Sequence, residues 1–467
     1  MRLGQIISNS GAEIIRGNAE SEISAICSDS RKVTPGALFI AVKGCKVDGH
    51  QFIDAAVAAG AEAVVSTDRR GLALIADSFY GHPSGKLNLV GITGTNGKTT
   101  TVTLLYNMFR NLGYECGLLS TIANYVGPKR LETANTTADP ITINSLMDEM
   151  VNAGCEYCFM EVSSIGVEQE RVTGLEFKVG IFSNLTHDHL DYHGTFAEYL
   201  RCKKLFFDNL PATAFAITNI DDRNGLVMMQ NTAATVVTYS CRSGADHTCR
   251  IVEEGFEGML LKIDGTEVWT RLVGAHNAYN VLAVYCTAIA LGADKDEALV
   301  AISRLNSAPG RLENLRGPRD ISVIIDYAHT PDALENVLKT LRDVAPERKL
   351  ICLFGCGGDR DKTKRPEMAA VAEKFADSIF VTSDNSRSER TEDIIEDIRK
   401  GFSPEGQAKA ICIPDRKEAI RAAILTAPAG ATILLAGKGH ETYQIIGSET
   451  FHFDEREITE EIFKTIR

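Results

Sequence analysis

The amino-acid sequence predicts an α/β protein with three domains. A chain of 467 residues is too long for one compact core, since single cores stop growing at roughly 250–300 residues. The composition is that of ordinary globular proteins, with 44% hydrophobic and 24% charged residues. Apolar, strand-like segments also alternate with helix-like segments along much of the chain, which is typical of a mostly parallel sheet.

The first domain is expected to cover residues 1–87. Two apolar segments, ALFIAVKG at 37–44 and AEAVVS at 61–66, are predicted to be buried strands. The segment between them, FIDAAVAAG at 52–60, is predicted to be a helix closed by its glycine. The polar, turn-rich GHPSGKLN at 81–88 then marks the end of this domain.

The second domain is expected to cover residues 88–315. It opens with the apolar segment LVGIT at 89–93, a glycine-rich turn, and a predicted helix at 99–112. Such a βα unit is typical of the start of a nucleotide-binding domain. Further buried strands are predicted at 155–162, 178–185, 214–219 and 235–240.

The third domain is expected to cover residues 316–467, after a hinge at 308–320 that is rich in proline, glycine and charge. Strands are predicted at 321–328, 349–355, 378–383 and 431–437, and helices from Pro331, at 366–375, from Thr391 and at 416–426. This alternation predicts a parallel, doubly wound, Rossmann-like sheet. Its ligand-binding groups should lie at the carboxyl ends of the strands.

Charge and hydropathy limit the partners and the compartment. The net charge of −13 would repel a nucleic acid backbone, and no long basic run offsets it. No segment resembles a signal peptide or approaches the length of a membrane span, so a cytoplasmic protein without membrane insertion is expected. The twelve irregularly spaced cysteines are typical of reduced core thiols, and Cys155 and Cys158 lie in an apolar run that disfavours a redox role.

The strongest local motif is GITGTNGKTT at residues 91–100, between a predicted strand and a predicted helix. The glycines let the backbone approach phosphate oxygens, the lysine adds positive charge, and the first threonine can ligate Mg²⁺. Ile92 occupies the place of the first glycine of the strict P-loop pattern. The candidate phosphate-binding residues are Gly94, Thr95, Asn96, Gly97, Lys98, Thr99 and Thr100.

A P-loop alone could belong to a GTPase, a kinase, a motor or a ligase. The guanine-reading Asn-Lys-x-Asp is absent, since the nearest approximation at 219–222 lacks the lysine. Glu161 ends an apolar strand, where a carboxylate can hold Mg²⁺ against phosphates. The segment NLTHDHLDYHG at 184–194 is dense in His and Asp without completing a zinc set, which favours an Mg²⁺ or phosphate site.

Together these motifs resemble the Mur ligase family, whose members build the peptidoglycan peptide. GTNGKTT, MEVSS, NLTHDHLDYHG, YLRCKKLFF, GAHNAYN, PGRLE, DYAHTPD, GCGGDRDKTKRP and GKGHE occur in the order expected of that family. SDSRKVTPGALFIAVKG at 28–44 and DGHQF at 48–52 resemble the uridine-nucleotide domain of the members that add the third amino acid. The resemblance therefore covers nearly the whole chain.

The resemblance implies an ATP-dependent ligase. ATP would phosphorylate the terminal carboxylate of UDP-N-acetylmuramoyl-L-alanyl-D-glutamate, and the amine of an amino acid would then displace phosphate. Two Mg²⁺ ions would neutralise the crowded negative charge that makes the carboxylate a poor electrophile. Lys98, Glu161, His189 and Lys203 would be catalytic. Thr99, Glu161, His189 and a carbamylated Lys203 would serve the metal ions.

The resemblance also assigns binding residues. Asn277, Asn280, Arg311 and Asp326 would complete the ATP site across the hinge. The UDP-sugar dipeptide would meet Ser30, Thr136, Thr137, Ser163, Gln169 and Arg171. This chain has Ile165 where family members commonly have His, so a contact made by that His must be lost or replaced.

The incoming amino acid would meet Arg360, Asp384, Asn385, Arg387, Gly437 and Glu441. Meso-diaminopimelate is favoured over L-lysine, because Arg387 can pair with its second carboxylate while Glu441 takes the distal ammonium. Ser386 stands where members adding diaminopimelate typically have proline, which should free the backbone. The alternatives are the same reaction with L-lysine, or another Mur or folylpolyglutamate-type ligase. A monomer is expected.

Overall fold

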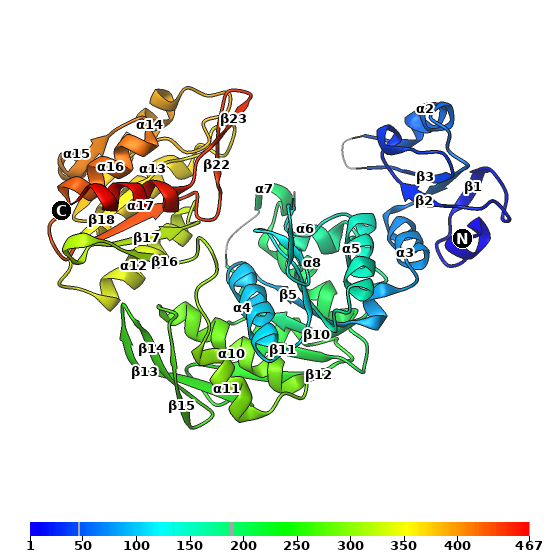
Figure 1. Ribbon diagram of the computed structural model, residues 1–467, viewed down its shortest axis with the longest axis horizontal. Coiled ribbons are helices and arrows are strands. Elements are labelled where there is room, and N and C mark those ends of the chain that lie inside the picture. Colours follow the sequence, from blue (N-terminus) through cyan, green and yellow to red (C-terminus); the bar gives the residue numbers. More distant parts are fainter. Residues whose placement is uncertain (45–46, 134, 187–189, 467) are drawn as a thin grey trace. The chain divides into compact units, whose positions relative to one another are not determined.

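The computed structural model describes residues 1–44, 47–133, 135–186 and 190–466 (Figure 1). The chain forms two compact units. The first comprises Met1–Arg250, Lys262–Val268 and Tyr279–Leu305, and the second comprises Ile251–Leu261, Trp269–Ala278 and Asn306–Arg467. None of the helices in the described ranges combines the length and the apolar character that crossing a bilayer requires.

The N-terminal sheet has four strands in the order β1-β4-β3-β2. They are β1 (Glu13–Arg16), β2 (Ala25–Cys27), β3 (Ala37–Val42) and β4 (Ala63–Thr67), with helices α1 (Leu3–Ile7), α2 (Ile53–Ala58) and α3 (Arg69–Phe79). Strands β3 and β4 confirm the two predicted apolar strands, since both are buried runs paired in parallel. The predicted helix at 52–60 is shorter, because a 3₁₀ turn at Gly49–Phe52 precedes α2.

The central sheet has eleven strands in the order β15-β14-β13-β12-β11-β10-β5-β9-β6-β7-β8. The predicted strands are β5 (Asn88–Thr93), β9 (Tyr157–Glu161), β10 (Phe177–Phe182), β11 (Phe215–Asn219) and β12 (Thr235–Ser240). The others are β6 (Cys116–Leu119), β7 (Asn124–Val126), β8 (Lys129–Leu131), β13 (His247–Gly255), β14 (Gly258–Ile263) and β15 (Thr266–Thr270). Strand β5 lies between β9 and β10 and is parallel to both, so its carboxyl end is in the middle of the sheet.

Helices α4 (Lys98–Asn111), α5 (Pro140–Asn152), α6 (Ser164–Glu168), α7 (Leu190–His193), α8 (Phe196–Asp208), α9 (Gly225–Met228), α10 (Ala275–Ala290) and α11 (Lys295–Ser303) follow or connect these strands. Local signals set their starts. Asp139 caps α5 by accepting from the Thr142 N–H, and Thr195 caps α8 by accepting from the Glu198 N–H. The predicted helix at 99–112 is α4, which begins one residue earlier.

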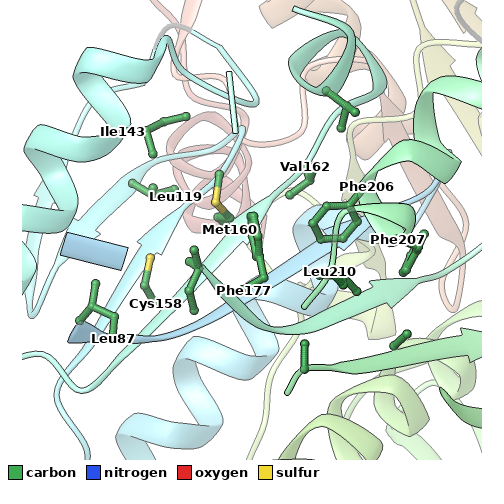
Figure 2. Close-up of a cluster of buried hydrophobic side chains, with 14 of the residues drawn as sticks. Leu87, Leu119, Ile143, Cys158, Met160, Val162, Phe177, Phe206, Phe207 and Leu210 are labelled. Atoms are coloured by element: carbon green, nitrogen blue, oxygen red, sulfur yellow. The ribbon is translucent and has the colours of Figure 1, made fainter. Parts of the chain in front are cut away.

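A buried apolar cluster anchors the central sheet (Figure 2). Met160 of β9 and Phe177 of β10 belong to it, together with Phe206 and Phe207 of α8. The rings of Phe177 and Phe206 meet edge to face with centroids 4.9 Å apart. This packing fixes α8 against β10 and so positions the polar residues that α8 carries.

The C-terminal sheet has six strands in the order β16-β17-β21-β18-β19-β20. They are β16 (Glu313–Arg316), β17 (Ser322–Asp326), β18 (Leu350–Phe354), β19 (Ser378–Val381), β20 (Ala410–Cys412) and β21 (Thr432–Ala436). The helices are α12 (Pro331–Val344), α13 (Lys364–Phe375), α14 (Thr391–Arg399), α15 (Pro404–Lys409), α16 (Arg416–Thr426) and α17 (Glu455–Thr465), and β22 (Tyr443–Ile446) pairs with β23 (Glu449–His452). The predicted α/β class is confirmed, although β16 pairs with β17 in antiparallel orientation at the edge of this otherwise parallel sheet.

Strand β16 alters the interpretation of the predicted hinge at 308–320. It belongs to the C-terminal sheet, and the Glu313 carboxylate accepts hydrogen bonds from the Arg456 guanidinium and from the Gly310 N–H. A boundary between residues 315 and 316 would divide this strand, and the second compact unit takes the chain from Asn306. Residues 310–316 are therefore part of the C-terminal unit and not a free connection.

Candidate active site

The loop between β5 and α4 is shaped to admit only glycine at two positions. Gly94 has φ 154° and Gly97 has φ 87°. A Cβ atom on Gly94 would lie 1.9 Å from Ser183 Oγ, and one on Gly97 would lie 2.5 Å from Asn280 Oδ1. Helix α4 begins directly after this loop without a side-chain cap, so its first N–H groups are suited to an anion.

Two lysines converge on this loop. Lys98 Nζ donates to Gly94 O at 2.8 Å, and Lys203 Nζ, from α8, donates to the same oxygen at 2.9 Å. Lys203 is only 1% exposed. Two ammonium groups that share one carbonyl oxygen repel each other, and a buried location strengthens that repulsion. Lys203, the position at which the resemblance implies carbamylation, therefore lies at the phosphate loop beside Lys98.

Glu161 offers an oxygen suited to a cation. It ends β9 and is 1% exposed, and its Oε1 accepts from the Thr121 N–H at 2.8 Å. Its Oε2 is buried and has no hydrogen-bond partner among the described residues. A buried carboxylate oxygen left this way is costly unless a cation or donor meets it, and carboxylate and hydroxyl oxygens suit Mg²⁺.

Other predicted metal positions are less complete. Thr99 is buried in the first turn of α4, as a P-loop threonine should be. His189 lies outside the described residues. Within the ranges that are described, no three His, Cys, Asp or Glu side chains form a ready-made metal cage. A hydroxyl and a single carboxylate are nevertheless a donor set that Mg²⁺ accepts when phosphate and water supply the remaining ligands.

A cavity of about 700 Å³ lies between the N-terminal sheet and the central one, within the first compact unit. Three predicted substrate residues line it, namely Ser30, Gln169 and Arg171. Arg171 donates through Nη2 to Gln169 Oε1 at 2.7 Å and through Nη1 to Thr137 O at 2.6 Å. Lining residues that the sequence interpretation missed include Asp29, Arg31, Arg69, Phe52 and Asn135. Asp29, Arg31 and Phe52 lie in the motifs at 28–44 and 48–52, which pointed to this region without assigning them, whereas Arg69 and Asn135 lie outside both motifs.

The remaining predicted substrate residues form a chain of contacts next to Glu161. Thr137 Oγ1 donates to Glu161 O at 2.9 Å and accepts from the Ser163 N–H at 3.0 Å. Thr121 Oγ1 donates to Thr136 Oγ1 at 3.1 Å. The structure thus brings Thr136, Thr137 and Ser163 to the strand end that carries the candidate magnesium ligand.

The position of Ile165 has a neighbouring imidazole from another segment. Ile165 lies in α6 beside Ser164, and Ser164 Oγ is 2.9 Å from His193 Nε2. His193 belongs to the DYHG part of the histidine-rich motif and is buried. A histidine is therefore present beside α6, although position 165 itself holds an apolar side chain.

The two predicted asparagines follow each other by one turn of α10. Asn280 faces Gly97 and accepts from Thr101 Oγ1 at 3.4 Å. Asn277 donates through Nδ2 to Val273 O at 2.8 Å. Asn280 is thus placed at the phosphate loop, and Asn277 supports the start of its own helix.

Arg311 and Asp326 lie close together in the second unit. The Arg311 guanidinium is 5.0 Å from the Tyr327 ring centroid, and Asp326 accepts from the Leu312 and Ala328 N–H groups, each at 2.8 Å. Burial raises the pKa of the Asp326 carboxyl, an effect that nearby Arg311 opposes. The turn carrying Arg311 is fixed by Glu313 and Arg456, as described above.

The predicted amino-acid residues gather at the carboxyl ends of β18, β19 and β21. Asn385 Nδ2 donates to Glu441 Oε2 at 2.9 Å. The fully buried Lys438, which the sequence interpretation missed, donates to the same Glu441 oxygen at 3.0 Å and to Asn385 Oδ1 at 3.2 Å. One Glu441 oxygen therefore already has two donors, so the expected contact with a distal ammonium falls to Oε1.

The loop that carries Arg387 is not freed by Ser386. Arg387 has φ 49°, and its N–H donates to Ile445 O at 3.2 Å while its carbonyl accepts from the Gly447 N–H at 2.8 Å. The expectation of a looser backbone is therefore wrong, because these bonds to the β22–β23 hairpin hold the loop. Arg387 Nη1 donates to Gly358 O at 2.9 Å.

Two cationic side chains flank Gly357. A Cβ atom on Gly357 would lie 3.0 Å from Arg387 Nη1 and 3.6 Å from Arg360 Cγ. Arg360 is exposed and Arg387 half-buried. Asp384 lies against Gly437, whose φ is 116° and whose added Cβ would lie 2.7 Å from Asp384 Oδ2. The site therefore has a cationic corner, formed by Arg360 and Arg387, and next to it an anionic corner, formed by Asp384 and Glu441 with Asn385.

Replacing Gly94 by alanine tests the phosphate loop. The added methyl would collide with Ser183 Oγ, and the left-handed backbone would be strained, so ATP-analogue binding should be lost and stability should fall by about 1–3 kcal/mol. Gly113→Ala is the matched control, because Gly113 also has a positive φ but nothing lies within 4 Å of its Cβ position. Isothermal titration with an ATP analogue measures the affinity of each variant, and thermal unfolding measures its stability. Unchanged affinity in Gly94→Ala would refute the phosphate-loop assignment.

Comparison with known families agrees with this arrangement. The family model of the Mur ligase middle domain matches residues 92–288, that of the Mur ligase glutamate ligase domain matches residues 310–439, and that of the Mur ligase family catalytic domain matches residues 22–83. The chain belongs to the Mur ligase family, and the predicted ligase class is confirmed.

Individual relatives narrow the comparison. The chain is 50% identical to the UDP-N-acetylmuramoyl-L-alanyl-D-glutamate–2,6-diaminopimelate ligase of Phocaeicola vulgatus, over 99% of each chain. It is 48% identical to the ligase of the same name from Cytophaga hutchinsonii, over 97% of each chain. A solved structure of a UDP-N-acetylmuramoyl-L-alanyl-D-glutamate–2,6-diaminopimelate ligase superposes with a TM-score of 0.73 at 30% identity, covering 100% of this chain and 99% of the other.

Proposed function

We propose that this chain joins meso-diaminopimelate to UDP-N-acetylmuramoyl-L-alanyl-D-glutamate in an ATP-dependent reaction that passes through an acyl phosphate. The full-length similarity to ligases of that name supports the reaction as a whole. The observation that carries the ATP-dependent step is the phosphate loop, where two lysines meet a backbone that only glycine can adopt, and Glu161 at the end of the neighbouring strand has an oxygen without a hydrogen-bond partner among the described residues.

Each domain has a role in this proposal. Residues 1–87 bind the uridine nucleotide, with Ser30 on one side of the cavity and Gln169 and Arg171 on the other. The central domain binds ATP and carries out phosphoryl transfer. The C-terminal domain, which includes β16, binds the amino acid. A volume of about 700 Å³ is typical of a site for a ligand of this size, which supports the cavity as the uridine-nucleotide site.

The residues of the phosphate loop bind and orient the nucleotide. On nucleotide binding, Lys98 exchanges its hydrogen bonds to Gly94 O and Thr95 O for contacts with the phosphates, and the α4 N-terminus supplies N–H donors. When bound, two Mg²⁺ ions would neutralise the phosphate oxygens and the substrate carboxylate. Thr99 and Glu161 would hold one ion, and a carbamylated Lys203 and His189 would hold the other. Asn277, Asn280, Arg311 and Asp326 are the further proposed nucleotide contacts.

The surroundings of Lys203 support the proposal that it is carbamylated. The Lys203 ammonium would first lose a proton to solvent, and the free amine would then add CO₂ and release a second proton to give an anionic carbamate, which attracts the Lys98 ammonium. The buried position protects such an adduct from bulk water. Tyr199, whose ring centroid is 4.7 Å from Lys203 Nζ, limits the space around it.

The amino-acid site suits a substrate with charges of both signs at its far end. Arg387 and Arg360 offer the cationic corner for the second carboxylate of diaminopimelate, and Glu441 with Asp384 offers the anionic corner for an ammonium. L-lysine lacks that carboxylate and would leave the arginines facing no anion. We further propose that the enzyme acts in the cytoplasm as a monomer.

Phosphate release tests the proposed function. Inorganic phosphate should appear only when ATP, Mg²⁺, UDP-N-acetylmuramoyl-L-alanyl-D-glutamate and diaminopimelate are all present, and the product should carry one added diaminopimelate by mass spectrometry. Release that needs no UDP-sugar dipeptide, or no amino acid, would refute the proposal. Preference for a folate or for L-lysine would replace it with one of the alternative ligases.

Replacing Glu161 by glutamine tests the magnesium site. The amide keeps the size of the side chain and the contact with the Thr121 N–H but loses the charge. The Mg²⁺ concentration for half-maximal activity should therefore rise by about tenfold to a hundredfold. Glu156→Gln is the control, since Glu156 is exposed beside the opposite end of the same strand. A Glu161→Gln enzyme with the Mg²⁺ dependence of the wild type would exclude Glu161 as a ligand.

A further inference from the structure

We infer that Arg416 is a positioning residue for the amino acid, because its guanidinium joins the two loops that are proposed to bind the amino acid. The inference rests on the proposed function and adds a residue that makes no contact of its own with substrate. Arg416 is the first residue of α16, and its side chain is fully buried.

The three donor groups of this guanidinium reach three different segments. Nη1 donates to Ser383 O at 3.0 Å, Nη2 donates to Ala436 O at 2.9 Å, and Nε donates to Glu455 Oε1 at 2.8 Å. Ser383 directly precedes Asp384 and Asn385, and Ala436 directly precedes Gly437. Arg416 therefore bonds to the backbone at the root of both amino-acid loops.

The sheet order explains why such a bridge is needed. Strands β19 and β21 are not neighbours, because β18 lies between them. No ladder hydrogen bond joins these two strands directly, so their ladders do not set the separation of the loops that follow them. Arg416 connects the ends of both across the intervening strand, and the planar, rigid guanidinium fixes the distance between the two carbonyl oxygens.

The contact between Asn385 and Glu441 depends on the separation of these two loops. Asn385, from the loop after β19, donates to Glu441, from the loop after β21, at 2.9 Å. Gln444 of β22 also joins the two segments, by donating to Ser383 Oγ at 2.9 Å and Asp384 O at 3.1 Å, and Lys438 donates to Asn385 Oδ1 at 3.2 Å. Arg416 differs from both because it bonds to the backbone carbonyls at the ends of the two strands themselves. A change of about 1 Å in loop separation would break the Asn385–Glu441 contact, and misplacements of this size commonly cost about a hundredfold in rate.

Glu455 completes the arrangement by neutralising the arginine. Its side chain is fully buried at the start of α17, and its Oε2 has no hydrogen-bond partner among the described residues. A buried ion pair of this kind is rarely the most stable solution, since apolar residues of similar volume often serve stability as well or better. The presence of a buried pair at this location is therefore better explained by loop geometry than by stability.

The test separates positioning from stability with a double variant. Arg416→Met leaves Glu455 as an unpaired buried charge and should lower the melting temperature, whereas Arg416→Met combined with Glu455→Met should recover most of that loss. In both variants the KM for diaminopimelate should rise by about tenfold or more, while the KM for ATP stays within about twofold of the wild type.

Arg342→Met is the matched control. Arg342 also pairs with one carboxylate, that of Asp377, and donates to two carbonyls, those of Phe375 and Arg348, but it lies beside the amino ends of β18 and β19. The Arg342→Met substitution should lower the melting temperature without raising the KM for diaminopimelate.

Two outcomes would overturn the inference. One is a double variant in which the KM for diaminopimelate returns to the wild-type value together with the melting temperature. The other is an Arg342→Met enzyme whose KM rises as much as that of Arg416→Met. If the wild type uses L-lysine in place of diaminopimelate, the proposed function fails, and the same comparison made with lysine still decides the role of Arg416.

Discussion

Replacing Lys203 by alanine is expected to lower ligase activity by about a hundredfold to a thousandfold. The variant loses the carbamate that would stabilise charge beside the phosphate loop, and Lys203 is buried against Gly94 O, so no other side chain of α8 can take its place. The rate of phosphate release with all substrates present measures the loss.

Chemical rescue distinguishes the carbamate from a structural lysine. Short carboxylic acids such as acetate or formate should restore part of the activity of Lys203→Ala, because a small anion can occupy the space left by the carbamate. Lys204→Ala is the control. Lys204 is the next residue of α8 and pairs with Asp208 on the same helix, and no contact of Lys204 with the phosphate loop is observed among the described residues, so its loss should leave activity nearly unchanged. Full activity of Lys203→Ala without added anion would contradict the assignment.

The wild type is expected to prefer diaminopimelate over L-lysine by roughly ten to a hundred and fifty times in kcat/KM, which corresponds to about 1–3 kcal/mol. The preference arises because lysine leaves the guanidinium beside Gly357 without an anion. Arg387→Ala should remove most of this preference by lowering activity with diaminopimelate far more than activity with lysine. Steady-state assays with each amino acid measure both effects.

Arg390→Ala provides the comparison for the same loop. Arg390 is largely exposed and lies 3.8 Å from Glu392, so its removal should leave the preference for diaminopimelate intact. An Arg387→Ala enzyme that keeps the wild-type preference would show that another group recognises the second carboxylate. A wild type that prefers lysine would exclude the proposed pocket altogether.

The parallel strands were predictable because both of their faces are buried. Strands β5, β9 and β10 are continuous apolar runs, which local sequence reveals directly. Strand β16 was not predictable in this way. Its residues are only partly buried or exposed, and it exists because its backbone pairs with β17 at the edge of the sheet. The β22–β23 hairpin was missed for a similar reason, since β23 is exposed throughout.

The residues of the candidate site also fall into two groups, those that local sequence indicates and those that depend on distant segments. Gly94, Lys98 and Glu161 could be proposed from the sequence because the roles proposed for them depend on neighbours in sequence, namely a strand end and a helix start. Arg416 and Lys438 could not be found, because charged residues are usually exposed and nothing local marks these two as buried. Their burial depends on partners in other segments. Glu455 is 39 residues from Arg416, and Asn385 is 53 residues from Lys438.

The place of β5 in the central sheet also has a consequence for biosynthesis. Strand β5 carries the phosphate loop but pairs with β9 and β10, and Phe182, which ends β10, follows Thr93 by 89 residues. At roughly 5–20 residues per second, a ribosome takes about 4–18 s to make that stretch. During this interval β5 lacks both parallel partners until β9 has been made, and it lacks β10 until the end. We therefore expect nascent chains in which β5 has left the ribosome but β10 has not to bind chaperones, and chains in which both have emerged to be released.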